Sequence, residues 1–282
     1  MVRVSQVATS LLLGFVTPVV CHGYLKSIQV NGQDYLAWQV DQDDFLSPPP
    51  VRYARKLKDN GSVPNFTTAD ITCGAGGNIP AEGTIELKAG DKVFAFPCWY
   101  MGFEFGYADV KWSSTMKWDQ WGSSHSGPVM NYLAHCTNDD CKSFKGDKGN
   151  VWVKISQLGY NPSAQPPWAS DLLREQGAKW NIVIPPTLAP GEYLLRHEIL
   201  GLHVVDKRMA AQFYPSCTHI RVTEGGSSQL PEGVSLPGAY DPDDTAGILV
   251  PLWKVNQGQQ EYIPPGGPVW SEAAPDPNRS GP

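Results

Sequence analysis

The sequence carries little charge and has no cluster of positive residues. Only 18% of its 282 residues are charged, and the net charge of −6 is spread along the chain without a basic stripe. Domains that bind nucleic acid usually carry such a stripe, so nucleic acid is not an expected partner. Internal repeats and a Ser/Thr-rich linker to a second module are also missing from the sequence. These absences favour one globular domain.

Helical periodicity is nearly missing as well, and only residues 169–176 show it convincingly. Other segments alternate with period two, and clusters drawn from 28 glycines and 25 prolines separate them. The alternating segments are 84–88, 151–155, 180–184, 193–199 and 220–222. Short strands with turns between them predict an all-β fold, an immunoglobulin/fibronectin-like β-sandwich in which two sheets bury alternate side chains.

The N-terminal apolar run is too short to span a membrane. Its centre covers residues 11–16, and Pro18 interrupts it. Arg3 lies in front of the run, and a small-residue cleavage site ends at Cys21. Residues 1–21 therefore have the pattern of a secretory signal peptide, and we expect a secreted, extracellular protein with no membrane partner.

The remaining chain divides into a β-sandwich domain at 22–263 and a Pro- and Gly-rich tail at 264–282. One large all-β domain can hold this length. The stretches 41–72 and 225–282 do not alternate, and loops of such length are usually functional or disordered. We expect the tail to be poorly ordered.

Two further features agree with export. Three sequons, at Asn60, Asn65 and Asn278, are candidate glycosylation sites. Five cysteines lie beyond residue 21, namely Cys73, Cys98, Cys136, Cys141 and Cys217. In an oxidising compartment most of them should pair, and the odd number leaves one over.

Cleavage after Cys21 would make His22 the first residue of the mature chain. A terminal histidine offers two nitrogen donors, because the α-amine has a pKa of about 7.7–8.0 and its neutral form is accessible near pH 7. A third nitrogen from another histidine would complete a planar site that suits Cu(II). The alternative is that His22 merely follows the signal peptide, and its position alone does not decide between the two.

Longer motifs occur in a characteristic order along the rest of the chain. They are H-G-Y-L from His22, C-G-A-G-G-N from Cys73, A-E-G-T-I-E-L-K-A-G-D from Ala81, S-H-S-G-P-V-M-N-Y-L-A-H-C from Ser124, L-L-R-H-E-I-L-G-L-H from Leu194, A-Q-F-Y-P-S-C from Ala211, and L-P-G-A-Y with G-I-L-V between Leu236 and Val250. In these motifs the sequence resembles the auxiliary-activity family nine lytic polysaccharide monooxygenases, fungal copper enzymes once classed as glycoside hydrolases. The resemblance covers nearly the whole chain.

The resemblance implies a role for each matching residue. His22 and His125 would bind one copper ion per chain, and Tyr214 would lie axial to it. His203 and Gln212 would donate hydrogen bonds to an oxygen species there, orienting the chemistry without binding the metal.

The resemblance also implies the reaction, which is oxidative cleavage of β-1,4-glycosidic bonds by hydroxylation at C1 or C4. An external electron donor and O2 or H2O2 would take part, and the protein is expected to be a monomer. The long loops would form a flat face for cellulose, another glucan or a hemicellulose. Tyr240 matches a family aromatic on that face, where it would stack on a sugar ring.

The cysteines pair by the same resemblance, as Cys73 with Cys217 and Cys136 with Cys141. Cys98 is left in the aromatic-rich segment 93–109, which departs from the family pattern. One hypothesis is a retained intron or another gene-model error, and the other is a genuine insertion that forms an apolar flap near the copper.

Three more histidines have no matching ligand role. We interpret His197 as structural, on the inward face of its strand. His135 precedes a cysteine in a turn, and the alternation of its strand predicts that His219 points outward.

Two other classes of function compete with the monooxygenase. A glycoside hydrolase needs two positioned carboxylates, and the acidic clusters 41–44 and 241–244 are the candidates, although both lie in turn-like segments. A non-catalytic copper-binding protein would use the same two histidines but would not need His203, Gln212 and Tyr214.

Overall fold

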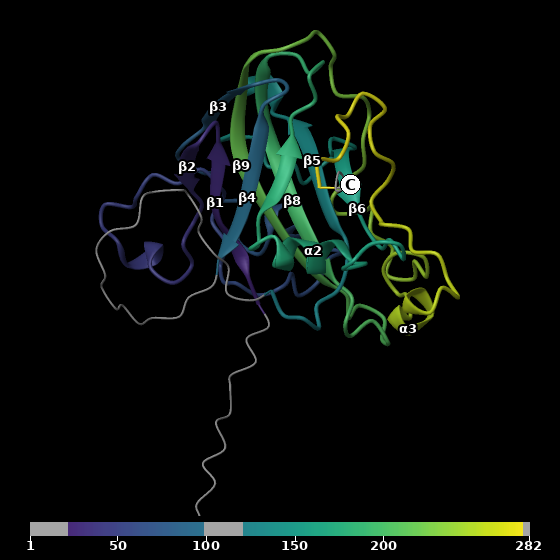
Figure 1. Ribbon diagram of the computed structural model, residues 1–282. Helices are drawn as coiled ribbons and strands as arrows, with labels where there is room; N and C mark the ends of the chain where they lie inside the picture. The colour runs from purple at the N-terminus through teal and green to yellow at the C-terminus, as the bar shows by residue number, and fades with distance from the viewer. Residues whose placement is uncertain (1–21, 99–120, 279–282) are drawn as a thin grey trace, which may run out of the picture.

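The computed structural model of the protein describes residues 22–98 and 121–278, with only the backbone of 94–98. Within these residues nine strands form two sheets packed face to face, which confirms the all-β sandwich (Figure 1). The sheet orders are β2-β1-β4-β7 and β3-β9-β8-β5-β6. No helix in the described ranges is long and apolar enough to cross a bilayer.

The elements have the following bounds. The strands are β1 (Tyr24–Val30), β2 (Gln33–Leu36), β3 (Ile85–Lys88), β4 (Lys92–Cys98), β5 (Val129–His135), β6 (Val153–Leu158), β7 (Trp180–Val183), β8 (Gly191–Gly201) and β9 (Gln212–Glu224). The helices are α1 (Asp70–Cys73), α2 (Ala169–Glu175), α3 (Leu252–Asn256) and the short 3-10 turns η1 (Asp43–Phe45) and η2 (Thr137–Asp139).

Two large hydrophobic clusters stabilise the fold. The inner core lies between the sheets and includes Ile28 of β1, Trp180 of β7 and Leu195 of β8. The outer core covers the opposite face of the five-stranded sheet, where Leu194 of β8 packs with loop residues such as Leu236. Long loops therefore build a second core on a sheet face that a two-layer sandwich would leave to solvent.

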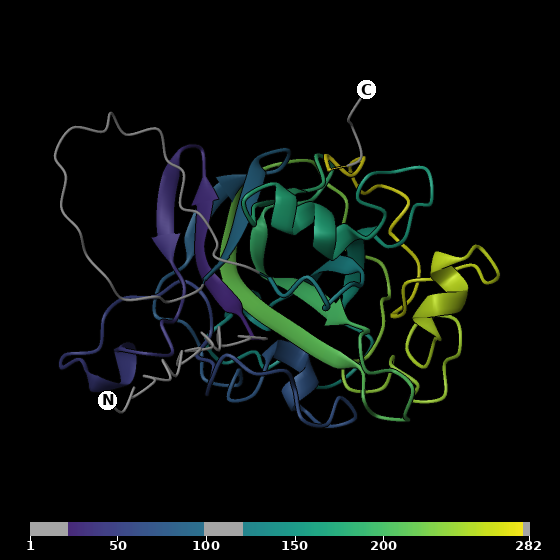
Figure 2. The same cartoon turned by 60° about the horizontal axis from the view of Figure 1, so that its bottom comes forward.

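The strand ends that matter for the site meet at one end of the sandwich. β8 ends at Gly201 opposite Gln212, where β9 begins, and Val129 at the start of β5 pairs with Ile199. This end is turned towards the viewer in Figure 2. Three loops converge here: the chain entering β1, the segment that precedes β5 and the connection between β8 and β9.

The atypical segment 93–109 is not, as a whole, an insertion between elements. Residues 92–98 form β4, which lies between β1 and β7, with Val93 opposite Val30 and Ile182. Val93 is fully buried in the inner core. The first part of the segment is therefore a strand of the four-stranded sheet, and residues 99–109 lie outside the described residues.

The expectation of a poorly ordered tail is wrong for residues 264–278. Lys154 of β6 donates from Nζ to the carbonyls of Pro265 and Gly267, each at 2.7 Å, and its own carbonyl accepts from the Trp270 amide at 2.8 Å. Asn278 hydrogen-bonds to Asn181 of β7. The composition of the tail could not predict these contacts, because a buried lysine far away in the sequence holds the tail in place.

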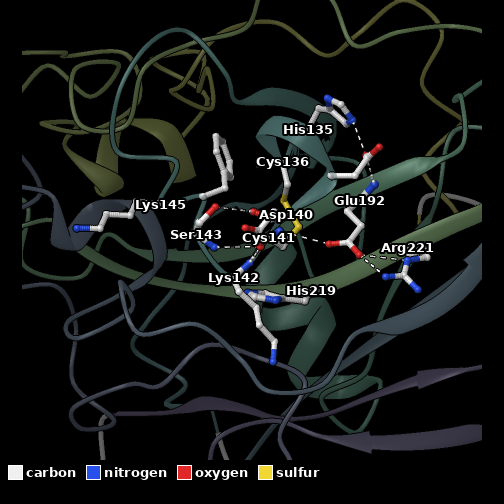
Figure 3. Close-up of a disulfide and its surroundings, with 12 residues drawn as sticks. His135, Cys136, Asp140, Cys141, Lys142, Ser143, Lys145, Glu192, His219 and Arg221 are labelled. Atoms are coloured by element: carbon white, nitrogen blue, oxygen red, sulfur yellow. Dashed lines mark hydrogen bonds and ion pairs between the residues drawn. A yellow bond between two sulfur atoms is a disulfide. The ribbon is translucent and has the colours of Figure 1, made fainter.

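Two disulfides are present in the part of the chain that the structure describes, and they are the two pairs implied by the resemblance. Cys73–Cys217 joins α1 to β9 across 144 residues, and Cys136–Cys141 closes a turn. Figure 3 shows the second bridge beside Glu192, whose carboxylate accepts from the Cys141 amide at 3.3 Å and from Arg221. The short bridge is thus tied to β8 and β9 of the five-stranded sheet.

The prediction that His219 points outward is wrong. His219 is fully buried, and its Nε2 accepts a hydrogen bond of 3.3 Å from the buried guanidinium of Arg55. The loops around the disulfide of Cys136 cover this face, and Arg55 also donates to the carbonyl of Cys141. Alternation correctly assigned the side of the sheet, but that side is covered by loops.

Candidate functional site

His125 lies in a loop whose backbone is held on three sides. Its amide donates to the Gly122 carbonyl at 2.8 Å, and its carbonyl accepts from Trp121 Nε1 at 2.9 Å and from Ser170 Oγ at 3.1 Å. Ser124 Oγ lies 3.1 Å from the Nδ1 atom of His125. The ring is almost completely buried. These contacts fix the imidazole before any ligand arrives.

Gly127 allows this loop to lie directly against β8. A Cβ atom at this position would lie 1.8 Å from the carbonyl oxygen of Leu200, a separation that atoms cannot adopt. The Gly127 amide donates to Ser170 Oγ at 2.9 Å. Only glycine fits, since any side chain would push the loop that carries His125 away from the strand.

A row of aromatic rings connects His125 to His22. The rings of His125 and Trp121 are 5.7 Å apart, those of Trp121 and Tyr214 are 5.2 Å apart, and those of Tyr214 and His22 are 6.4 Å apart. On its other side His125 packs against His203 at 3.7 Å. Residues from three distant parts of the chain thus gather at this end, with His22 exposed.

Gln212 and His203 flank this row of rings. The hydroxyl of Tyr214 donates to Gln212 Oε1 at 2.7 Å. A Cβ atom on Gly201 would lie 3.6 to 3.7 Å from His125, His203 and Gln212, so these three side chains surround one strand end. Burial, and secondarily the positive charge of His22, lower the pKa of His203. Its ring therefore favours the neutral form at neutral pH.

The donor set fits a metal held by two imidazoles and one amine. Across the described ranges, no three His, Cys, Asp or Glu side chains lie close enough to hold a metal ion. A site built on His22 and His125 needs a third donor, and a free α-amine at His22 would provide it. The buried Nδ1 of His203 has no hydrogen-bond partner among the described residues, which suits a group that contacts a ligand next to the metal.

The predicted surface role of Tyr240 is wrong. Tyr240 is only 3% exposed, its ring stacks on Phe213 at 4.6 Å, and its hydroxyl donates to Glu198. It belongs to the outer core and cannot reach a sugar ring. An exposed aromatic does occur nearby in the sequence, at Trp253 on α3, which is 56% exposed.

The three sequons differ in accessibility. Asn65 is exposed, and its Oδ1 accepts from the amide and the hydroxyl of Thr67. Asn60 is half-buried. Asn278 is only 8% exposed, and its Nδ2 donates to the carbonyl of Asn181 at 2.8 Å. Because a glycan would have to be attached to that nitrogen, the structure contradicts the prediction at Asn278.

The acidic clusters serve the structure of their loops. Asp43 is buried and receives two hydrogen bonds of 2.7 Å from Arg52. Asp244 Oδ1 accepts from two backbone amides in its own turn, and Asp243 pairs with Arg208. No carboxylate pair facing an open site emerges from these clusters, so the geometry does not support a hydrolase.

Sequence reasoning missed Trp121 and Ser170. Trp121 contacts both His125 and Tyr214, and Ser170 of α2 supports the carbonyl of His125. The position of Trp121 four residues before His125 was a usable signal. Ser170 gave none, because only the folded chain brings it to the loop.

The β-sandwich gathers two histidines, a tyrosine and a glutamine at one end, where its loops lie. This arrangement is typical of a β-sandwich oxidoreductase. The sequence model of Auxiliary Activity family 9 (formerly GH61) matches residues 22–262. The chain belongs to this family, and it is a lytic polysaccharide monooxygenase.

Curated relatives and solved structures agree with this assignment. The chain is 35% identical to AA9 family lytic polysaccharide monooxygenase A of Gloeophyllum trabeum, over 92% of this chain and 75% of the relative. It is 34% identical to monooxygenase F of Botryotinia fuckeliana, over 92% and 96%. The extended catalytic domain of H. jecorina LPMO9A superposes with a TM-score of 0.72 at 32% identity, covering 89% of this chain and 91% of that one.

Proposed function

We propose that the protein is a secreted, copper-dependent enzyme that cleaves β-1,4-linked polysaccharides by hydroxylating C1 or C4 of a sugar ring. The observation that carries this proposal is the row of rings that joins His22 to His125 through Tyr214 and Trp121. His22 is the first residue after the predicted signal peptide, which spans 1–21. Removal of the signal peptide would create the free α-amine of His22 that the donor set needs.

We assign His22 and His125 to one copper ion. His22 would supply its amine and its imidazole, and His125 would supply the ring nitrogen that does not contact Ser124, namely Nε2. When bound, copper supplies the one-electron chemistry that activates O2 or H2O2. The chain supplies rigid ligands, because the loop that carries His125 is held by Trp121 and Ser170.

Tyr214, Gln212 and His203 would control the surroundings of the metal. The hydrogen bond from Tyr214 to Gln212 Oε1 orients the phenol, which would lie beside the copper. His203 lies against His125, and its lowered pKa keeps the ring neutral, so that it donates or accepts a hydrogen bond without adding charge. A neutral donor here would hold an oxygen-containing ligand without competing for the metal.

The substrate would be a polysaccharide surface or chain, such as cellulose, another β-1,4-glucan or a hemicellulose. An external electron donor and O2 or H2O2 complete the reaction. Trp253 of α3 is an exposed aromatic, and α3 lies at the lower right of the molecule in Figure 1. We propose that the enzyme acts as a monomer.

Product analysis tests the proposal. Secreted protein loaded with copper is incubated with cellulose and ascorbate, and soluble products are identified by mass spectrometry. Oxidised oligosaccharides are expected, and their loss is expected without reductant or with a chelator. The His203→Ala variant should bind copper but release far fewer oxidised products. His135→Ala is the matched control, because that histidine is exposed and pairs with Asp139 in the turn.

The same assay separates the competing functions. Hydrolysis would release unoxidised sugars without reductant and would survive the chelator. A purely copper-binding protein would retain the metal yet give no oxidised products from any of several glucans and hemicelluloses. Either result would refute the proposed reaction.

A further inference from the structure

A row of buried polar residues crosses the inner face of the five-stranded sheet. Ser156 of β6 lies opposite Asn131 of β5, Asn131 lies opposite His197 of β8, and His197 lies opposite Ser216 of β9. All four are at most 7% exposed. Their strand neighbours two positions away, such as Leu195 and Ile199, belong to the apolar inner core. Polar groups in such a place are expected to be fully hydrogen-bonded.

The hydrogen bonds along this row have a fixed direction. Asn131 Nδ2 donates to Ser156 Oγ at 2.9 Å, so the other amide atom, Oδ1, faces His197. That oxygen can only accept, and it lies 2.8 Å from His197 Nδ1, which must therefore carry the proton. The other ring nitrogen, Nε2, then carries no proton and can only accept a hydrogen bond. Its burial lowers the pKa of His197 to about 3, which keeps the ring neutral.

Nothing in the described chain satisfies this acceptor. His197 Nε2 is buried and has no hydrogen-bond partner among the residues that the structure describes. His197 instead lines a cavity of about 30 Å³, together with Ser216, Tyr214, Trp121 and Leu25. A cavity of roughly 10–15 Å³ already holds one water molecule if polar partners are present. The cavity is therefore large enough for one small molecule and too small for a sugar.

We propose that this cavity is a built site for one internal water molecule, which donates a hydrogen bond to His197 Nε2. Ser216, which lies opposite His197 on β9, also lines the cavity, and we assign its hydroxyl as a second partner for the same water. The water would extend the polar row that begins at Ser156 into the cavity that Tyr214 and Trp121 also line. His197 is thereby a positioning residue, because it holds this water in the cavity that Tyr214 also lines.

A crystal structure of the copper-loaded protein at about 1.2 Å resolution tests the site directly. The expected result is one ordered water within hydrogen-bond distance of His197 Nε2. An empty cavity, or a molecule that does not contact Nε2, would overturn the proposal. This experiment needs neither a variant nor an activity assay. A negative result would therefore refute the water site without bearing on the proposed reaction.

Two variants sharpen the test. His197→Phe keeps a flat ring but removes the acceptor, and the water is expected to be lost. Tyr193→Phe is the matched control, because it removes another buried hydrogen bond from the same face of β8, the one to the Ala189 carbonyl, without touching the cavity. Water retained in His197→Phe, or lost in Tyr193→Phe alone, would contradict the role of Nε2. If His197→Phe does not fold, the wild-type structure still decides.

Discussion

The inner and outer cores are of similar extent but differ in chemistry. The inner core packs around a row of neutral polar residues. The outer core borders buried charged residues, among them Lys154, Arg196 and Glu198. In the sheets, the backbone groups are paired between strands. Irregular loops leave backbone carbonyls that need hydrogen-bond donors from side chains.

The buried charges supply those donors. Arg196 donates to the carbonyls of Ile71 and Thr72 in α1, each at 2.8 Å, and Lys154 donates to Pro265 and Gly267 in the tail. Glu198 neutralises Arg196 and accepts from Tyr240. We infer that charged residues of β6 and β8 fasten the long loops, while the inner core holds the sheets together.

Breaking the charged network of the outer core should have the largest effect. Glu198→Gln leaves Arg196 buried without a counter-charge, and loss of one partner of a buried pair typically costs about 3–5 kcal/mol. Urea unfolding monitored by fluorescence would measure the change. The control is Asp243→Asn, which breaks an exposed pair with Arg208 and should leave the midpoint unchanged. Equal effects of the two substitutions would contradict the distinction.

The long-range disulfide should follow in size. Removing Cys73–Cys217 with a double alanine substitution should destabilise the protein by about 2–4 kcal/mol, since the bridge closes a loop of 144 residues. Removing Cys136–Cys141, which are 5 residues apart, should cost less because the loop-closure entropy is smaller. Calorimetry of both variants compares them, and a larger loss for the short bridge would be the opposite of the expected order.

Gly127→Ala tests the contact between the site loop and the sheet. The clash with the Leu200 carbonyl should cost about 1–3 kcal/mol and displace His125, so copper affinity should fall as well. Gly201→Ala serves as the control, because its Cβ meets only ordinary contacts beyond 3.5 Å at the same strand end. Copper titration by calorimetry, with melting curves, measures both effects. Unchanged affinity in Gly127→Ala would show that the loop does not position the ligand.

Alternation predicted β3 and β7, and parts of β6, β8 and β9, but it did not mark β5. β3 alternates strictly between buried and exposed residues, and β7 nearly does so. β5 is buried at six consecutive positions, and no periodic pattern marks it. The missing signal has a physical cause, since the outer core covers the second face of that strand.

The candidate site was predictable only in part. Composition and position pointed to His22, and the resemblance supplied His125, Tyr214, His203 and Gln212, which the fold brings together. The prediction for Tyr240 was wrong because the sequence of a loop motif does not show whether the loop folds over a sheet. Burial of that ring depends on Glu198, 42 residues away.

A further effect, which grows as the pH falls, concerns the buried histidines. Burial lowers the pKa of His197 and of His219 to about 3, against about 6.5 in the unfolded chain. Below pH 6.5 the unfolded state therefore binds more protons, and each histidine reduces stability by about 1.4 kcal/mol per pH unit until its folded pKa is reached. Unfolding free energies at pH 7 and pH 5 test this.

The His219→Gln variant isolates one of these contributions. Its amide oxygen can still accept from Arg55, but it cannot titrate, so the dependence of stability on pH should be weaker than in the wild type. His135→Ala, which alters an exposed histidine, should leave the slope as it is. A wild-type slope in His219→Gln would mean that this histidine is not neutral in the folded protein.

Electron paramagnetic resonance of the mature, Cu(II)-loaded protein tests the central claim most directly. The account predicts that Edman sequencing finds His22 first, and that one Cu(II) per chain gives an axial spectrum with nitrogen couplings. That spectrum should disappear in His125→Ala and persist in His135→Ala. An unaltered spectrum in His125→Ala, or a chain that begins elsewhere and still gives it, would contradict the assignment of His22 and His125 to the copper.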